Sequence, residues 1–305
     1  MKCDREAAEA AAVSEQEERM KRKMTVSNVI IVAFLLLMTA LMLIPFWQII
    51  VISLSDSRDY LLDPTHLTLH RPDFSIFQSI FTSGGILRGL LVSGGVVVMG
   101  WALSMVLTVS GGYALAHKKL PGRRFFLTMI IISMYFNGGV ITMYVLLRKL
   151  GLLDTIFALF VPTACNTFHL LLVKNYMTAL PAELEEAASI DGCNYIQTLI
   201  RVIIPVCKPV LLTVSMFYVV NYWNDYFSAM MYLEDQKLYP LALILRNVII
   251  SRTMTVSSLA GTGGNSPTEQ YAMALIIVSM LPVIVMYPLI QKHFTAGIMM
   301  GAVKE

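Results

Sequence analysis

The sequence is poor in charged residues. Asp, Glu, Lys and Arg make up 14% of its 305 residues, against about 25% in an average soluble domain. Hydrophobic residues make up 56%, and the mean hydropathy is +0.67. A formal net charge of +3 provides no basic surface of the kind that binds nucleic acid. The composition therefore excludes an ordinary soluble domain and predicts an integral membrane protein.

The sequence also lacks the patterns of nucleotide, metal and catalytic sites. There is no G-x-x-x-x-G-K-[ST] motif, so no phosphate-binding loop is predicted. The four cysteines show no C-x-x-C spacing, and the five histidines do not cluster with carboxylates or cysteines. We therefore expect free thiols and no catalytic centre, metal or cofactor in this chain. His169, inside an apolar stretch, has either a proton or substrate role or a hydrogen bond within the helix bundle.

Six apolar stretches are long enough to cross a bilayer, which takes about 20 residues. They predict an all-α integral membrane fold with six transmembrane helices. Their ranges are 24–55, 89–116, 125–147, 155–173, 202–224 and 270–291. The second contains the runs SGGILRG (in part) and SGGVVVMG, whose small residues favour close packing of helices.

The distribution of basic residues predicts which side each loop faces. Placing both termini inside puts roughly two thirds of the 23 lysines and arginines in the cytoplasm. The pair Arg148 and Lys149, in a short outer loop, is the exception. We therefore expect a charged cytoplasmic tail over 1–25, followed by a membrane domain over 26–305 with both ends inside.

The cytoplasmic loop 181–205 is more polar than the apolar sequence around it. Pro181 and the acidic residues after it predict a short helix, because both are favoured in a first helical turn. Gly192 then permits a tight turn that a residue with a Cβ atom resists, and a second amphipathic turn leads to Pro205. A short helix, a tight turn and a second helix make a rigid projection, here called the knob. The knob would either bind a soluble partner or pack against the membrane helices of its own chain.

These residues carry a family resemblance. The pattern Glu186-Ala187-Ala188, Gly192, Val202 and Ile204-Pro205 resembles the cytoplasmic signature of permease subunits of binding-protein-dependent ABC importers. The longer form EEAASIDG, with the stretches GGYALAHKKLPGRRFF, NYWNDYFSAMMYLEDQKLYPL and GIMMGAVK, is similar to the maltose-permease-like type I members. Within these, it most resembles the polysaccharide or complex-oligosaccharide subfamily of Firmicutes. The resemblance covers nearly the whole chain from about Val29.

The resemblance implies a type I ABC importer transmembrane domain and a set of partners. These are a second homologous permease subunit, a cytoplasmic ABC ATPase dimer that binds ATP and Mg²⁺, and an extracellular sugar-binding lipoprotein that delivers an oligosaccharide. It implies location in the plasma membrane, here of a Gram-positive bacterium. The implied ATPase-coupling residues are Glu186, Ala187, Ala188, Asp191, Gly192 and Pro205.

Two further regions are candidate contacts for substrate or partner. Polar and aromatic residues gather at the outer end of the fifth span, where they would either line a sugar path or form an interfacial aromatic belt. These are Asn221, Tyr222, Trp223, Asn224 and Asp225, with Asn137, Asn166 and Tyr218 as weaker candidates. The outer loop 225–269 resembles one that reaches into the binding protein, or it is only a connector. Its tip would be Gly261, Thr262, Gly263, Gly264 and Asn265.

Two alternative functions stay open at this point. The same architecture could import another solute, such as an amino acid or a peptide. A secondary transporter would need no ATPase, but it predicts carboxylates inside the spans, and here only Asp225 lies near an edge.

Overall fold

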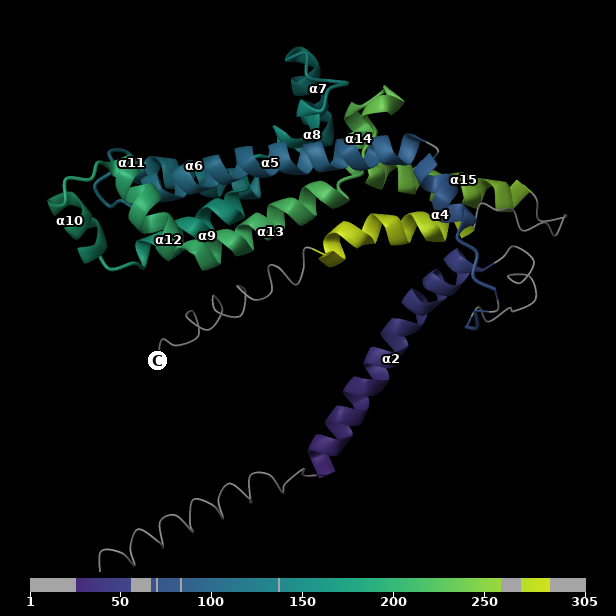
Figure 1. The fold of residues 1–305 in the computed structure, drawn as a ribbon. Coiled ribbons are helices and arrows are strands. Elements are labelled where there is room, and N and C mark those ends of the chain that lie inside the picture. Colours follow the sequence, from purple (N-terminus) through teal and green to yellow (C-terminus); the bar gives the residue numbers. More distant parts are fainter. Residues whose placement is uncertain are drawn as a thin grey trace, which may run out of the picture. The chain divides into compact units, whose positions relative to one another are not determined.

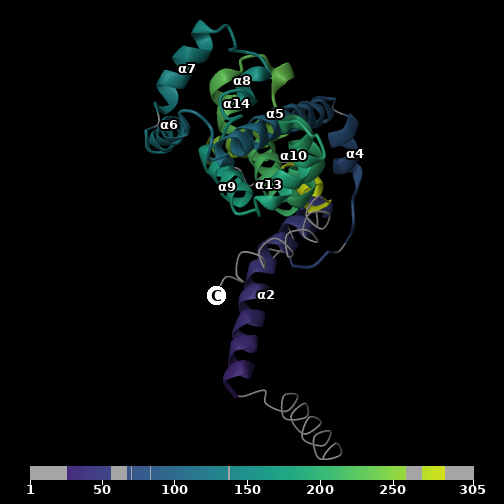
Figure 2. The ribbon, with the colours of Figure 1, turned by 90° about the vertical axis from the view of Figure 1, so that its left-hand side faces the viewer.

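The computed structural model describes residues 26–55, 67–69, 71–82, 84–136, 138–258 and 270–285. Most of these residues are helical (Figures 1 and 2). The chain divides into two compact units, residues 1–72 and 73–305, which we describe separately. The tail 1–25, expected to be cytoplasmic, lies outside the described residues.

The first unit consists mainly of one long helix, α2 (Val26–Leu54). An 18-residue window within Asn28–Leu54 has a mean hydropathy of 2.9, and most large apolar side chains from Val29 to Ile50 are exposed, whereas Val51 and Ile52 are buried. A helix that is apolar on every side is typical of a membrane span. Near its end, the Trp47 indole donates a hydrogen bond to the Leu67 carbonyl at 2.9 Å. The helix agrees with the first predicted span.

The second unit is built around α5 (Gly85–Ala116), which packs along α9 (Thr167–Thr178) and α13 (Lys208–Asn224) (Figures 1 and 2). Its core includes Val173 and Val214, both fully buried. A Cβ atom at Gly100 would lie 2.8 Å from Tyr222 Cε2, so this glycine lets α13 approach α5 closely. A Cβ atom at Gly89 would lie 2.5 Å from Ile244 Cδ1, while one at Gly94 would meet nothing within 4 Å. The predicted close packing of helices at small residues is confirmed at Gly100 and Gly89.

Two of the predicted spans are interrupted. The third is split into α6 (Arg123–Tyr135) and α7 (Gly139–Lys149). The fourth begins with the single turn α8 (Phe157–Phe160), and α9 follows only after an irregular stretch. Continuous helices over 125–147 and 155–173 are therefore not what forms, because an apolar run specifies burial in lipid and not backbone continuity.

The fifth span has a long bent entry. It begins with α11 (Tyr195–Thr198), a π-helical turn η1 (Leu199–Ile203) and α12 (Ile204–Val206). This segment meets α13 at an angle of 86° around Cys207. Pro205 and Pro209 lie on either side of the bend, and each lacks the N–H that a continuous helix would use. The bend thus has a local cause in the sequence.

Four more elements of the second unit lie toward the end that is away from α10 and α11 (Figure 1). These are α4 (Ser75–Thr82), α14 (Phe227–Tyr232), the 3₁₀ turn η2 (Gln236–Leu238) and α15 (Leu241–Ser258). A second apolar cluster, with Ile80, Leu241 and Leu275 at its centre, joins α4, the start of α5, α15 and the helix Gln270–Val285.

By length and composition, two described helices could each cross a membrane, or four spans if each bent pair counts as one. The sixth predicted span begins at the described helix Gln270–Val285, and its remainder to residue 291 lies outside the described residues. The count of six and the placement of both termini inside stay predictions.

Candidate functional site

The loop 181–205 forms a compact knob at one end of the second unit, where Figure 1 shows α10 and α11. Its first helix, α10, spans Glu183–Ile190 and carries three acidic residues in its first turn. Carboxylates there are stabilised by the helix dipole. The helix predicted from Pro181 and the acidic residues is confirmed.

Two backbone hydrogen bonds cap the C-terminal end of α10. Gly192 donates to the Ser189 carbonyl at 3.1 Å, and Cys193 donates to the Ala188 carbonyl at 2.9 Å. This pair of bonds is the Schellman motif, which requires a left-handed residue after the helix. Gly192 supplies it with φ of +78°. The predicted turn is confirmed, and its reason is the backbone angle, since a Cβ there would meet nothing within 4 Å.

The start of the next helix, α11, is also fixed by two hydrogen bonds. The Asn194 side chain accepts a hydrogen bond from the Gln197 backbone at 2.9 Å, and the Gln197 side chain accepts one from the Asn194 backbone at 3.0 Å. This reciprocal capping box fixes the start of α11. Only Gly192 and Cys193 separate the cap residues Asp191 and Asn194, so the relative direction of α10 and α11 is set by these hydrogen bonds.

The knob presents an apolar crest to its surroundings. Its side chains are Ile190, Tyr195, Ile196 and Ile200, with relative exposures of 87%, 76%, 69% and 57%. Glu186, Ala187, Asp191 and Pro205 are exposed too. Ala188 differs from the expectation of a contact residue: it is 5% exposed and faces the interior of the knob. Its small side chain lets α10 pack inward.

The knob is attached to the end of α5 through one histidine. His117 Nε2 lies 3.2 Å from Glu185 Oε2 of α10. The His117 ring also makes edge contacts with Tyr113 of α5, at 4.5 Å between centroids, and with Tyr195 of α11, at 5.8 Å. We call these four residues the anchor cluster. It joins both knob helices to the helix at the centre of the bundle.

The candidate substrate-path residues do not form one cluster. Tyr222 is 3% exposed, and its hydroxyl lies 2.8 Å from Ser104 Oγ. The Trp223 indole donates to the Ser279 carbonyl at 3.1 Å. Both side chains therefore hold helices together, and their expected role in a sugar path stays a prediction.

The other path candidates are divided between the surface and local capping. Asn221 and Asn224 are exposed, and the Asn224 amide donates to its own helix at Val220. Asp225 accepts from the Ser228 backbone at 3.0 Å. Asn166 caps the start of α9 by accepting from His169. Asn137 lies outside the described residues.

Sequence reasoning missed a set of interhelical hydroxyl contacts, here called the hydroxyl ladder. Besides Ser104 and Tyr222, Thr108 Oγ1 lies 2.8 Å from the Tyr218 hydroxyl, which also accepts from the Asn166 backbone at 3.2 Å. Hydroxyls that bond across helices stabilise packing in lipid. The signal was present, since the pairs 104/108 and 218/222 each lie four residues apart and share a helix face.

His169 packs among aromatic rings. Its ring stacks on Phe217 at 5.5 Å and meets Tyr218 edge-on at 4.5 Å. Within the described part of the chain, its Nδ1 atom is buried without a hydrogen-bond partner. The expected bond within the bundle is therefore not seen from this atom. No group of three potential metal ligands occurs among the residues described.

Asp154 holds the opposite end of the second unit together. Its carboxylate accepts hydrogen bonds from the Glu234 and Asp235 backbone N–H groups, both at 2.9 Å, and its own N–H donates to the Tyr232 carbonyl. The Asp235 and Glu234 donors lower the pKa of the Asp154 carboxyl below its ordinary value. This contact pins the first part of the loop 225–269. The predicted tip of that loop, 261–265, lies outside the described residues.

Comparison with known proteins places this architecture in a family. The family model for the binding-protein-dependent transport system inner membrane component matches residues 108–300. The polygalacturonan/rhamnogalacturonan transport system permease protein YtcP of Bacillus subtilis (strain 168) is 36% identical, over 91% of this chain and 98% of its own length. Protein LplC of the same organism is 37% identical, over 87% of this chain and 90% of its own length.

A solved structure agrees with these relatives. The crystal structure of a bacterial ABC transporter involved in the import of the acidic polysaccharide alginate contains a similar chain, with a TM-score of 0.81 and 30% identity. The match covers 90% of this chain and 98% of that one. The chain belongs to the family of inner membrane components of binding-protein-dependent transport systems.

Proposed function

We propose that the chain is the permease subunit of an ATP-driven ABC importer that takes up an oligosaccharide delivered by an extracellular binding protein. The apolar crest carries this proposal. Four large apolar side chains are exposed on a knob whose backbone is fixed by two caps. An exposed apolar patch on a rigid support is a mark of a protein contact site. The polysaccharides named for the relatives support a sugar as the solute.

The proposed assembly has three kinds of protein partner and transports an oligosaccharide. A second homologous permease completes the membrane pathway, and an ATPase dimer binds ATP and Mg²⁺ and grips the knobs. A lipoprotein on the outer face brings the oligosaccharide. This chain contributes no catalytic residue, and it resides in the plasma membrane. A Gram-positive host is supported by the relatives from Bacillus subtilis.

The structure offers a route by which a pull on the knob reaches the membrane helices. A displacement of α10 passes through Glu185 and His117 to the end of α5. A displacement of α11 passes through η1 and the bend at Cys207 to α13. Since α5 and α13 are joined by the hydroxyl ladder, both inputs act on one packed pair. The pair would then move as a unit when the ATPase dimer closes.

ATP dependence tests this function against secondary transport. The assembled complex would be reconstituted in liposomes with ATP trapped inside, and uptake of a labelled oligogalacturonide supplied with the binding protein would be measured. We expect uptake that stops when ATP is omitted and persists when an ionophore collapses ion gradients. Uptake that needs a gradient and ignores ATP would favour the secondary transporter. ATP-driven uptake of amino acids or peptides instead would favour the other solute class.

A further inference from the structure

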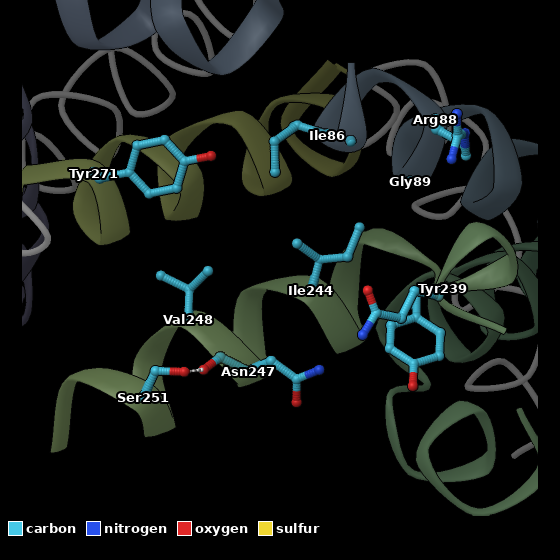
Figure 3. Close-up of a pocket in the computed structure, with 11 residues that line it drawn as sticks. Ile86, Arg88, Gly89, Tyr239, Ile244, Asn247, Val248, Ser251 and Tyr271 are labelled. Atoms are coloured by element: carbon cyan, nitrogen blue, oxygen red, sulfur yellow. Dashed lines mark hydrogen bonds between the residues drawn. The ribbon is translucent and has the colours of Figure 1, made fainter. Parts of the chain in front are cut away.

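A cavity of about 570 Å³ lies at the end of the second unit that is remote from the knob (Figure 3). This is within the range of small-molecule sites, about 300–1,000 Å³. Its walls come from the start of α5, from η2 and the residue after it, from α15 and from the helix Gln270–Val285. In Figure 3, Arg88 and Tyr239 lie at one end of the view and Tyr271 at the other.

The described lining of the cavity carries positive charge. Among the residues that the structure describes, the lining includes the cation Arg88 and the polar side chains of Gln236, Tyr239, Asn247 and Tyr271, and no carboxylate. Among the described residues, no acidic side chain forms an ion pair with Arg88. The first turn of α5 also borders the cavity at Gly85, and the positive end of the helix dipole adds to the same sign. A lining of this kind favours an anion over a neutral or cationic solute.

The polar side chains suit a sugar that carries a carboxylate. A guanidinium binds a carboxylate through two parallel hydrogen bonds. Amide groups such as those of Gln236 and Asn247 bond hydroxyls, and the Asn247 side chain is exposed at the cavity. The rings of Tyr239 and Tyr271 provide apolar faces of the kind that pack against a pyranose.

The two helices that flank the outer loop in sequence both border the cavity. Ser251 of its wall lies in α15, which continues to Ser258, and Tyr271 lies in the first turn of the helix Gln270–Val285. These helices flank the loop expected to contact the binding protein, so the cavity is a candidate first contact for a solute released there.

We propose that this cavity is an entry subsite that binds a uronic acid residue of an acidic oligosaccharide, with Arg88 on its carboxylate. The proposal rests on the proposed function, because it assigns a substrate class to the same importer. Arg88 is exposed and its side chain is not part of the packed core, so replacing it leaves the fold intact.

Direct binding to the importer, without its binding protein, tests the subsite. Trigalacturonate and its carboxyl-reduced trisaccharide would be titrated onto the complex in nanodiscs by saturation-transfer difference NMR. Arg88→Gln is expected to raise the Kd of trigalacturonate about tenfold, the loss of one charge-assisted contact. It should leave the reduced sugar unaffected, and Arg88→Lys should lie between. The control Arg148→Gln removes an exposed cation at another place and should change neither Kd.

Each other result overturns the subsite. These results are no change with Arg88→Gln, equal changes for both sugars, or no binding of trigalacturonate to the wild type. Phosphatidylglycerol retained by the wild type and lost from Arg88→Gln in native mass spectrometry, with both Kd values unchanged, would make the cavity a lipid site. ATP-driven uptake of neutral oligosaccharides alone would leave the importer standing while the subsite falls. Loss of ATP-driven uptake altogether would instead contradict the proposed function.

Discussion

His117 Nε2 lies 3.2 Å from Glu185 Oε2, and this contact joins the end of α5 to the first turn of α10. Both side chains are partly exposed, at 23% and 40%, so the contact itself is worth little stability. Its value is geometric, since the same ring touches Tyr113 and Tyr195 and thereby fixes both knob helices to one point.

Replacing His117 should therefore weaken the link between the knob and α5 more than it lowers the stability of the fold. We expect His117→Ala to lower ATP-driven uptake several-fold, while the free energy of unfolding falls by only about 1–2 kcal/mol from lost ring contacts. Uptake and thermal melting would be measured together, with the exposed neighbour Lys118→Ala as the control. A loss of uptake that simply follows the loss of folded protein would argue against an anchoring role.

Gly192 is predicted to tolerate asparagine better than alanine. Its φ of +78° costs an L-residue about 1–2 kcal/mol, and asparagine accepts this region more readily. Because a Cβ would meet open space, size should matter less than backbone preference. Gly192→Ala should therefore weaken coupled ATPase activity more than Gly192→Asn does. The reverse order would show that the Schellman turn is not what the position requires.

Two glycines of α5 form a matched pair for packing. A Cβ at Gly100 would lie 2.8 Å from Tyr222 Cε2 and 2.9 Å from Phe160 Cβ, whereas one at Gly94 would meet nothing within 4 Å. Gly100→Ala should cost about 1–3 kcal/mol by overpacking, and Gly94→Ala should be neutral or slightly stabilising. Thermal unfolding in detergent would measure both. Equal effects would mean that α13 does not approach α5 at Gly100.

Asp154 gives the fold an acid-sensitive contact. Its pKa is lowered in the folded protein by the Asp235 and Glu234 N–H donors. A lowered folded pKa contributes stability above the ordinary value of 3.8, and this stability is lost as the pH falls through the folded value. We expect wild type to melt at a higher temperature than Asp154→Ala at pH 6, with the difference shrinking below pH 4. A difference that stays constant to pH 3 would contradict the contact.

The helical class, the knob and its left-handed turn were predictable because each has a local signal. Apolar runs report burial in lipid, a proline followed by acidic residues reports a helix start, and Gly192 stands one residue beyond the helix cap Asp191. The breaks in the third and fourth spans coincide with Gly138-Gly139 and with Pro162, residue types that interrupt helices. A count of apolar residues does not register a break such as that between α6 and α7.

The candidate substrate-path residues point in different directions for a geometric reason. Residues 221–225 are neighbours in sequence, but successive residues on a helix point about 100° apart. Tyr222 consequently faces Ser104 in the core, while Asn221 and Asn224 face outward. Conversely, Arg88 and Tyr271 border one cavity although 183 positions separate them, which a reading along the chain does not bring together.

The central claim is that the apolar crest docks an ABC ATPase, and a purification with matched variants tests it most directly. The tagged chain would be isolated in gentle detergent from its native host as wild type, as Ile190→Asp and as Leu150→Asp, whose altered side chain is 61% exposed far from the knob. Mass spectrometry would identify what accompanies each. We expect an ATPase and a second permease with wild type and Leu150→Asp, and loss of the ATPase with Ile190→Asp. A wild-type chain that comes alone, or an Ile190→Asp variant that keeps its ATPase, would contradict it.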